Sequence, residues 1–499
     1  MKIPANLAGH TLLRLGGVGC QYLFFFLTAL LVGRTLGQGA LGDFFLAVTI
    51  LNLLGYTATL GLKQGVIRYA AIYLAQGRPG RVRPLAARAV LFGLLAGLAA
   101  AGAIWWGRSW LATVFFSSPC LAEGLVASAA GIPLWAVFTV LVAGLQGLKQ
   151  IRSKVFLENI LQPGTALILA AIAFLLFGPS LSGALWAWVA AVVIALFAAV
   201  LSVRRAPALR SAAPAALAPG AFRSILAYSL PLMGVGFLYY VFTRMDILML
   251  GHLRTSAEVG IYGVAARLAM IIPLPLEAFN VGFEPAVAEV GKTDRHRLRR
   301  LYCRATPWTL GAGAGLALVL LISAPAAFAL FGTNFGAGWP VLAILAAGQM
   351  VNLAVGPAGV LLSMTGHSRV VLYNCLGMVL LNLGLNFLLI PPYGAAGAAA
   401  ATAGALAGIN LLRLFEVRAL LGIHPFSRRY LKMGLVAGVA LAVSILGAQA
   451  FRSLEAWWVL VLVFAAVVPA YALVAVRLLL DRVSGGGIIN EFFRYNPGP

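Results

Sequence analysis

The sequence predicts an all-α polytopic membrane protein with about fourteen transmembrane helices. We expect two six-helix lobes related by a parallel repeat, plus two extra C-terminal helices. Three observations support this prediction. Hydrophobic residues make up 62% of the 499 residues and charged residues only 10%, which is too few polar groups to cover a soluble domain of this size. Cationic residues concentrate in every second gap between the apolar segments of the chain. Glycines recur along the chain at a nearly constant offset.

About fourteen apolar segments follow one another, each roughly 20 residues long and able to cross about 30 Å of hydrocarbon as a helix. They lie near residues 12–33, 43–62, 85–106, 121–145, 156–178, 182–202, 225–250, 259–283, 305–330, 340–364, 370–391, 394–414, 431–450 and 456–478. The first segment lacks a compact apolar run followed by a small-residue cleavage site, so we expect it to be retained.

The gaps between these segments differ in charge. The basic gaps are Lys63–Arg88, Lys149–Lys154, Arg204–Arg223, Lys292–Arg304 and Arg413–Lys432, with a weaker one at His367–Arg369. The alternate gaps hold only Arg34, Arg108, Arg254 and Arg452. Because basic loops are retained in the cytoplasm, both termini are predicted to be cytoplasmic. The net charge of +23 then indicates attraction to anionic membrane lipids rather than to nucleic acid.

The chain is predicted to contain an internal repeat. Gly33 and Gly42 are nine residues apart and correspond to Gly251 and Gly260 at an offset of 218. Two further pairs follow in order, Gly147 with Gly366 and Gly183 with Gly397. Because the repeat unit holds an even number of helices, both copies share one orientation, which is a transporter layout. The predicted parts are an N-lobe (1–203), a cytoplasmic linker (204–224), a C-lobe (225–420), and helices 13 and 14 with a tail (421–499).

The side chains that usually carry covalent chemistry are scattered. The four cysteines and five histidines form no CxxC or Cys/His spacing that would indicate a metal site or a redox pair. No glycine-rich phosphate loop lies in a soluble context. We therefore expect neither an enzyme nor a protein with a bound metal or cofactor.

Two stretches resemble polysaccharide-export flippases of the multidrug/oligosaccharidyl-lipid/polysaccharide (MOP) superfamily. GRTLGQGALGDFFLAVTI and the following GLKQGVIRYAAIYLAQGR are similar to the start of their first lobe. RMDILMLGHLRTSAEVGIYGVAARLAMIIPLPLEAF, followed by EPAVAEV, is similar to the start of their second. The resemblance implies a flippase that moves an undecaprenyl-pyrophosphate-linked glycan between leaflets of a bacterial inner membrane, acting as a monomer. An Arg directly before Met245-Asp246 departs from the family pattern.

Five cationic residues are candidates for binding the headgroup. Arg244 and Arg267 lie roughly 9–12 Å from the outer ends of their helices at 1.5 Å per residue, and are predicted to form an outer station. Arg14, Lys63 and Arg68 are predicted to form an inner station. A planar guanidinium suits a pyrophosphate because it can bind it bidentately.

Simpler structural interpretations exist for the same residues. Arg267 could pair with Asp246, and Lys63 and Arg68 could be interfacial anchors. Asp43 has the position of a helix cap or dipole partner. Lys154 and Glu158 have i,i+4 spacing and are predicted to bridge each other.

Energy coupling involves a second set of candidates. Glu277 and Glu284 are one heptad apart and could take part in a proton cycle. Oxygen ligands for a sodium ion come from Asp246, Asn382, Asn386 and Thr402, if their helices converge. The resemblance implies sodium in this corner of the second lobe, because the lipid-linked precursor flippases bind it there.

Two other functions compete with the flippase. A cation-coupled multidrug exporter of the same superfamily would need acidic or aromatic groups for its ligands, whereas this chain places more Arg and Lys within its helices. A membrane glycan polymerase or ligase would need a large outer loop with catalytic residues, and every outer loop here is short.

Overall fold

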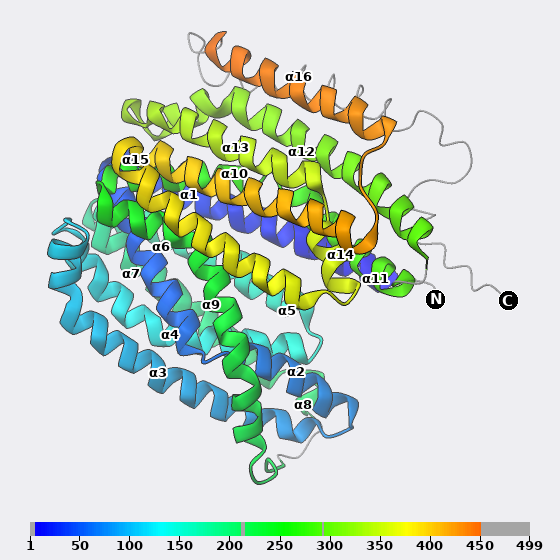
Figure 1. Ribbon diagram of the computed structural model, residues 1–499. Coiled ribbons are helices and arrows are strands. Elements are labelled where there is room, and N and C mark those ends of the chain that lie inside the picture. The colour runs from blue at the N-terminus through cyan, green and yellow to red at the C-terminus, as the bar shows by residue number, and fades with distance from the viewer. Residues whose placement is uncertain (1–4, 211–214, 292–293, 451–499) are drawn as a thin grey trace. The chain divides into compact units, whose positions relative to one another are not determined.

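The computed structural model describes residues 5–210, 215–291 and 294–450 (Figure 1). This part of the chain is helical throughout and contains no strand, as the sequence predicts. Its first half consists of α1 Ala5–Ala58, α2 Leu62–Ala75, η1 Pro79–Arg81, α3 Val82–Trp110, η2 Leu111–Phe115, α4 Leu121–Gly147, α5 Ile151–Val155, η3 Phe156–Leu161, α6 Gln162–Phe177, α7 Leu181–Arg204 and α8 Pro207–Arg210. The second half consists of α9 Ala221–Leu253, α10 Ser256–Ala269, α11 Leu274–Val290, α12 Arg295–Phe331, η4 Thr333–Ala337, α13 Gly338–Val355, α14 Ala358–Met364, α15 Ser368–Leu421 and α16 Arg428–Ala450.

Nine helices in the described ranges are long and apolar enough to cross a membrane, or ten if the bent pair α10–α11 counts as one span. Two of them, at residues 16–58 and 368–421, are about twice the length of a single crossing. Each contains one glycine outside helical geometry, Gly37 (φ 84°) and Gly394 (φ 55°). Both breaks fall between two predicted segments, so each long helix holds two crossings. With α16, this agrees with about fourteen crossings; the predicted segment 456–478 lies outside the described residues.

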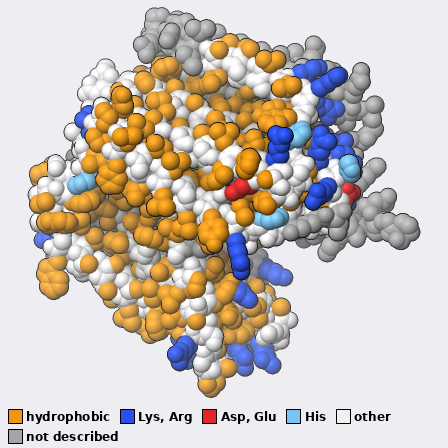
Figure 2. Space-filling view, viewed as in Figure 1, with side chains coloured by type: hydrophobic (Ala, Val, Ile, Leu, Met, Phe, Trp, Pro, Cys, Tyr) orange, Lys and Arg blue, Asp and Glu red, His pale blue; other side chains and the backbone are white. Residues whose placement is uncertain are grey.

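The described chain forms two compact units. Residues 12–260 make up the first, and residues from Ile261 onward, with the first turns of α1, make up the second. Helix α9 therefore belongs to the first unit, although the sequence predicts it as the opening helix of the C-lobe. Hydrophobic side chains cover most of the visible face, and Lys and Arg gather in a few clusters (Figure 2).

The helix ends of the two halves match, which supports the internal repeat. After α4, three consecutive backbone N–H groups donate to carbonyls of the last helical turn, and the same pattern follows α14. The left-handed residue of this turn is Lys149 (φ 61°) in the first copy and Gly366 (φ 87°) in the second. The same turn also follows α2, with Gly77 (φ 67°) in the left-handed position, so this turn alone does not set the register of the predicted match between Gly147 and Gly366. Glycine is the usual residue here because it has no Cβ to clash.

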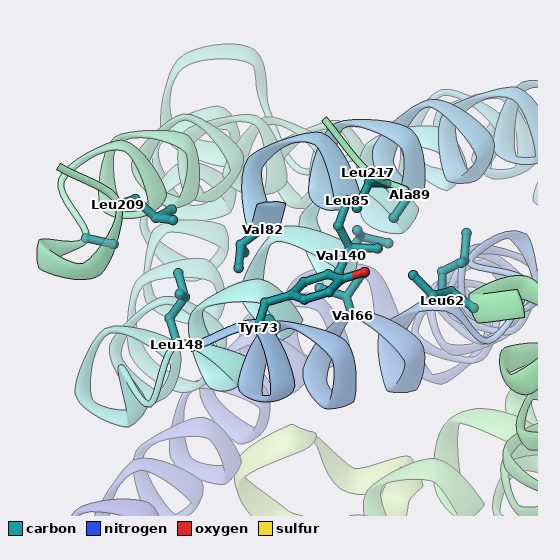
Figure 3. Close-up of a cluster of buried hydrophobic side chains, with 13 residues drawn as sticks. Leu62, Val66, Tyr73, Val82, Leu85, Ala89, Val140, Leu148, Leu209 and Leu217 are labelled. Carbon is teal, nitrogen blue, oxygen red and sulfur yellow. The ribbon is translucent and has the colours of Figure 1, made fainter. Parts of the chain in front are cut away.

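The segment between α7 and α9 is docked on the first unit. Ala206, Leu209 and Leu217 are buried in a cluster with side chains of α2, α3 and α4. Figure 3 shows Leu209 on the side of Val82 and Leu148, and Leu217 beside Leu85 and Ala89. Arg83 Nη2 donates to the Leu209 carbonyl at 2.9 Å, which satisfies a backbone acceptor in the linker. This part of the linker is fixed by apolar burial and is not a loose tether.

Candidate substrate-binding site

Lysines at the predicted inner ends of α2 and α5 approach one carboxylate, that of Glu158. Glu158 Oε1 lies 4.0 Å from Lys63 Nζ of α2, and Glu158 Oε2 lies 3.7 Å from Lys154 Nζ of α5. The predicted pair of Lys154 and Glu158 is therefore confirmed, and Lys63 joins it from another helix. Lys154 Nζ also donates to Gln146 Oε1 of α4 at 2.9 Å. We call Lys63, Lys154 and Glu158 the inner charged cluster; it carries two cations and one anion.

The acidic member of the inner charged cluster, Glu158, lies with Asn159 on a π-helical turn, η3. Such turns occur mostly as single-turn bulges and are frequent at functional sites. Asn159 Nδ2 donates to Gln21 Oε1 of α1 at 2.6 Å, so the turn is bonded to a second helix. Gln162 follows at the start of α6; its side chain is buried, and its Nε2 group has no described hydrogen-bond partner.

Arg68 lies on another face of α2 and has different partners from Lys63. Its guanidinium carbon lies 4.2 Å from the ring centroid of Tyr228 on α9 and 5.9 Å from that of Tyr69. This is a cation–π contact. Close backbone packing accompanies it, because a Cβ at Gly61 or Gly65 would overlap Ser229 of α9. The structure thus separates Lys63 from Arg68, which the sequence analysis grouped. Arg14 lies in α1, and its side chain is outside the described part of the chain.

Arg244 is half-buried within α9. It makes no hydrogen bond or ion pair with any side chain that the structure describes, and the neighbouring Asp246 is almost fully buried. One helical turn before Arg244, Tyr240 stacks on Tyr56 of α1 with ring centroids 6.3 Å apart and an interplanar angle of 13°. A cation at this position in a membrane-spanning helix requires a polar surrounding or an anionic ligand.

The part of α1 that follows its break at Gly37 meets the beginning of α10 within the first unit. Asp43 accepts hydrogen bonds from Ser256 Oγ at 2.6 Å and from Ser118 Oγ at 2.9 Å. It therefore joins three segments and does not cap its own helix, contrary to the sequence interpretation. Gly42 and Gly260, matched by the repeat, also face one another here. The repeated glycine spacing is therefore a sequence signal for this contact as well as for the topology.

The remaining candidates lie in the second unit. Arg267 Nη1 donates to the carbonyl of Gly263 at 3.1 Å, one turn earlier in α10. Glu277 is exposed in the first turn of α11. Thr402 Oγ1 lies 3.4 Å from the hydroxyl oxygen of Tyr262.

Asn382 and Asn386 form a buried amide pair on α15. Both side chains are fully buried, and Asn386 Nδ2 donates to Asn382 Oδ1 at 3.0 Å. The Nδ2 group of Asn382 has no described hydrogen-bond partner. Which amide atom is oxygen and which is nitrogen is an assignment, so the pair can also present a free oxygen. Neutral buried amide oxygens suit a hard monovalent cation. Among the described residues no group of three His, Cys, Asp or Glu side chains could hold a metal ion.

Comparisons with known proteins agree with this architecture. The family model described as "Polysaccharide biosynthesis protein" matches residues 8–282, and the MatE model matches residues 231–388. A search of curated protein sequences found no match.

Several solved structures share the fold. The lipid II flippase MurJ in an inward closed conformation has a TM-score of 0.73 at 14% identity, covering 94% of this chain and all of that one. An inward-facing multidrug resistance MATE transporter of the MOP superfamily has a TM-score of 0.66 at 16% identity, covering 83% and 98%. A MOP superfamily transporter from Pyrococcus furiosus has a TM-score of 0.59 at 14% identity, covering 83% and 95%. These are transport proteins and not enzymes. The chain is thus a multi-pass membrane protein that belongs to the polysaccharide biosynthesis protein family, within the MOP superfamily.

Proposed function

We propose that this protein is a flippase that moves a polyprenyl-pyrophosphate-linked oligosaccharide from the inner to the outer leaflet by alternating access. The observation that carries this proposal is the excess of cationic over acidic groups within its helices. Lys63 and Lys154 share a single carboxylate, and Arg244 has no described ion-pair partner. A pyrophosphate headgroup would supply the missing negative charge. Match to the polysaccharide biosynthesis family supports the same class of substrate.

The proposed cycle uses the candidates in two positions. The inner charged cluster, with Arg14 and Arg68, would receive the pyrophosphate at the cytoplasmic face. Arg244 of the first unit would bind it nearer the outer face, and Arg267 is the corresponding candidate of the second unit. The lobes would rock between these two states, as in other transporters built from repeats.

The surroundings of the protein follow from the same proposal. We place it in a bacterial inner membrane with both termini in the cytoplasm, because the basic gaps would then face the anionic lipids of that leaflet. Undecaprenyl pyrophosphate is the proposed lipid carrier, and a monomer is the proposed functional unit.

Energy for uphill transport would come from a sodium or proton gradient. The amide pair Asn382–Asn386 and Thr402, all on α15 of the second unit, would supply oxygen ligands for sodium. Glu277 is the alternative, as a carboxylate that exchanges protons from an exposed position.

A second candidate function is a cation-coupled multidrug exporter. The MatE family model matches residues 231–388, and the stacked pair Tyr56–Tyr240 is a surface that an aromatic cation could contact. This reading would require an acidic partner for the drug. The membrane glycan polymerase or ligase has no observation in its favour.

A binding competition on purified protein in nanodiscs would separate these functions. Undecaprenyl-pyrophosphate sugar would compete with a lipophilic cationic drug for the wild type and for an Arg244→Ala/Arg267→Ala variant. A matched double variant, Arg108→Ala/Arg254→Ala, removes two arginines from predicted outer loops. The flippase requires tight lipid binding that weakens only in the first variant. Preference for the drug, with both variants equal to wild type, would favour the exporter.

A further inference from the structure

The inner charged cluster is held together loosely. Charge-assisted N–H···O hydrogen bonds are typically about 2.7–2.9 Å long. Glu158 lies 3.7 Å and 4.0 Å from its two lysine nitrogens, beyond that range. By contrast, Lys154 donates to Gln146 at 2.9 Å. The Lys154 ammonium group is thus closer to Gln146 than to Glu158.

All three charged side chains are accessible. Their exposed fractions are 26% for Lys63, 22% for Lys154 and 28% for Glu158. A ligand can therefore reach the ammonium groups without unfolding a core. An ion pair of this exposure contributes little to stability, about 0–1 kcal/mol. Replacing the carboxylate by another anion at this position therefore costs little free energy.

The charge balance favours a ligand with more negative charge than a carboxylate. Two ammonium groups flank one carboxylate, so the cluster retains one excess positive charge. A pyrophosphate carries more negative charge than Glu158 and several acceptor oxygens, which can contact both lysines at once. Glu158 satisfies the lysines only in part.

Contacts other than the ion pairs hold the elements of the cluster in place. Asn159, next to Glu158 on the π-helical turn, is bonded to Gln21 of α1, which holds the turn in place. One turn later, the buried Nε2 group of Gln162 has no described acceptor. Neighbouring elements therefore fix the lysines and the turn, while Glu158 is the loosely held member.

We propose that Glu158 occupies the position of the substrate's phosphate in the unloaded protein and is displaced by the pyrophosphate during transport. This rests on the proposed flippase function and assigns Glu158 a role in release. The carboxylate neutralises the lysines while no substrate is bound. When it returns between them, it competes with the departing phosphate. Glu158 is thus a positioning residue. Its carboxylate lowers the affinity for the pyrophosphate lipid and speeds the release of that lipid.

The test compares Glu158→Gln and Glu158→Ala with wild type in nanodiscs. Undecaprenyl pyrophosphate binding is measured by titration, and flipping is measured in proteoliposomes. We expect both variants to bind the lipid about fivefold to tenfold more tightly, because one competing charge is removed a few ångströms from the site. Flipping should become slower at saturating lipid. Lys63→Ala and Lys154→Ala should bind more weakly, and Lys63→Ala/Glu158→Gln should return toward wild-type affinity.

Glu258→Gln is the matched control. It removes the same charge from another half-buried i,i+4 pair, Glu258 with Arg254, and should leave affinity and flipping unchanged. Thermal unfolding of each variant establishes that it is folded.

The outcomes separate the two proposals. If wild type binds the pyrophosphate lipid and the Glu158 variants bind it equally or more weakly, the displacement proposal is wrong and the flippase stands. If wild type ignores this lipid and binds a cationic drug that Glu158→Gln abolishes, both proposals fail together and Glu158 is a drug-binding acid.

Discussion

Gly42 and Gly260 lie against each other, although 218 residues separate them in the chain. A Cβ built on Gly42 would lie 3.0 Å from the backbone nitrogen of Gly260, and a Cβ on Gly260 would lie 3.2 Å from the nitrogen of Gly42. The same two atoms would also overlap the carbonyls of Ser256 and Gln38. The repeat therefore places two equivalent glycines at one crossing, where only glycine allows the helices this approach.

The first prediction concerns this crossing. Gly42→Ala and Gly260→Ala should each force α1 and α10 apart, because the added methyl group meets backbone atoms that cannot rotate away. We expect each to destabilise the protein by about 1–3 kcal/mol, the usual cost of overpacking, and to reduce flipping. Thermal unfolding and flux in proteoliposomes measure the two effects. Gly39→Ala is the control, because nothing lies within 4 Å of its added Cβ. Equal behaviour of all three variants would contradict the close crossing.

The second prediction concerns Asp43, which accepts hydrogen bonds from two serine hydroxyls. Asp43→Asn removes the charged acceptor from both hydrogen bonds and replaces one oxygen with an N–H₂ group, to which a serine hydroxyl cannot donate. Losing a buried hydrogen bond to a charged group costs about 1.5–3 kcal/mol. We expect a loss in this range, measured by unfolding. Ser118→Ala and Ser256→Ala should each lose less, and combining either with Asp43→Asn should be less than additive. Full additivity would mean that Asp43 does not depend on these serines.

The sequence predicts local features well, and cross-helix contacts poorly. The lengths of the apolar segments predict the crossings, and the glycine spacing predicts the repeat. Both can be read from the sequence without knowing which segments are in contact. The pair Lys154–Glu158 was predictable for the same reason, since four residues bring two side chains to one helix face.

Contacts between distant segments needed the fold. Nothing near Asp43 indicates that Ser256 approaches it, and nothing near Lys63 indicates that it faces Glu158 while Arg68 faces Tyr228.

The third prediction concerns the docked linker. Leu209 is almost fully buried between α2, α3 and α4, and its carbonyl accepts from Arg83. Leu209→Ala should destabilise the first unit by about 2–5 kcal/mol, the range for a leucine removed from a core. Arg205→Ala, at an exposed linker position, should change stability by less than about 0.5 kcal/mol. The rate of protease cleavage within residues 204–220 measures undocking of the linker, and it should rise in Leu209→Ala. A linker that is cleaved equally in wild type and Leu209→Ala would contradict its docking.

The fourth prediction concerns the amide pair on α15. If Asn382 and Asn386 bind a cation, replacing both should harm function, whereas a purely structural pair should leave function unchanged. Replacing both partners of a buried hydrogen bond by apolar groups of similar shape is nearly neutral for stability. We therefore expect Asn382→Leu/Asn386→Leu to unfold within about 1 kcal/mol of wild type while flipping loses its dependence on sodium. Asn374→Leu is the contrasting variant, because Asn374 Nδ2 donates to Glu416 Oε2 at 2.6 Å and its loss leaves a carboxylate without that donor. This single change should cost about 1.5–3 kcal/mol without altering the sodium dependence. Sodium dependence that persists in the double variant would remove the amide pair from coupling and leave Glu277, tested by Glu277→Gln against a proton gradient, as the remaining candidate.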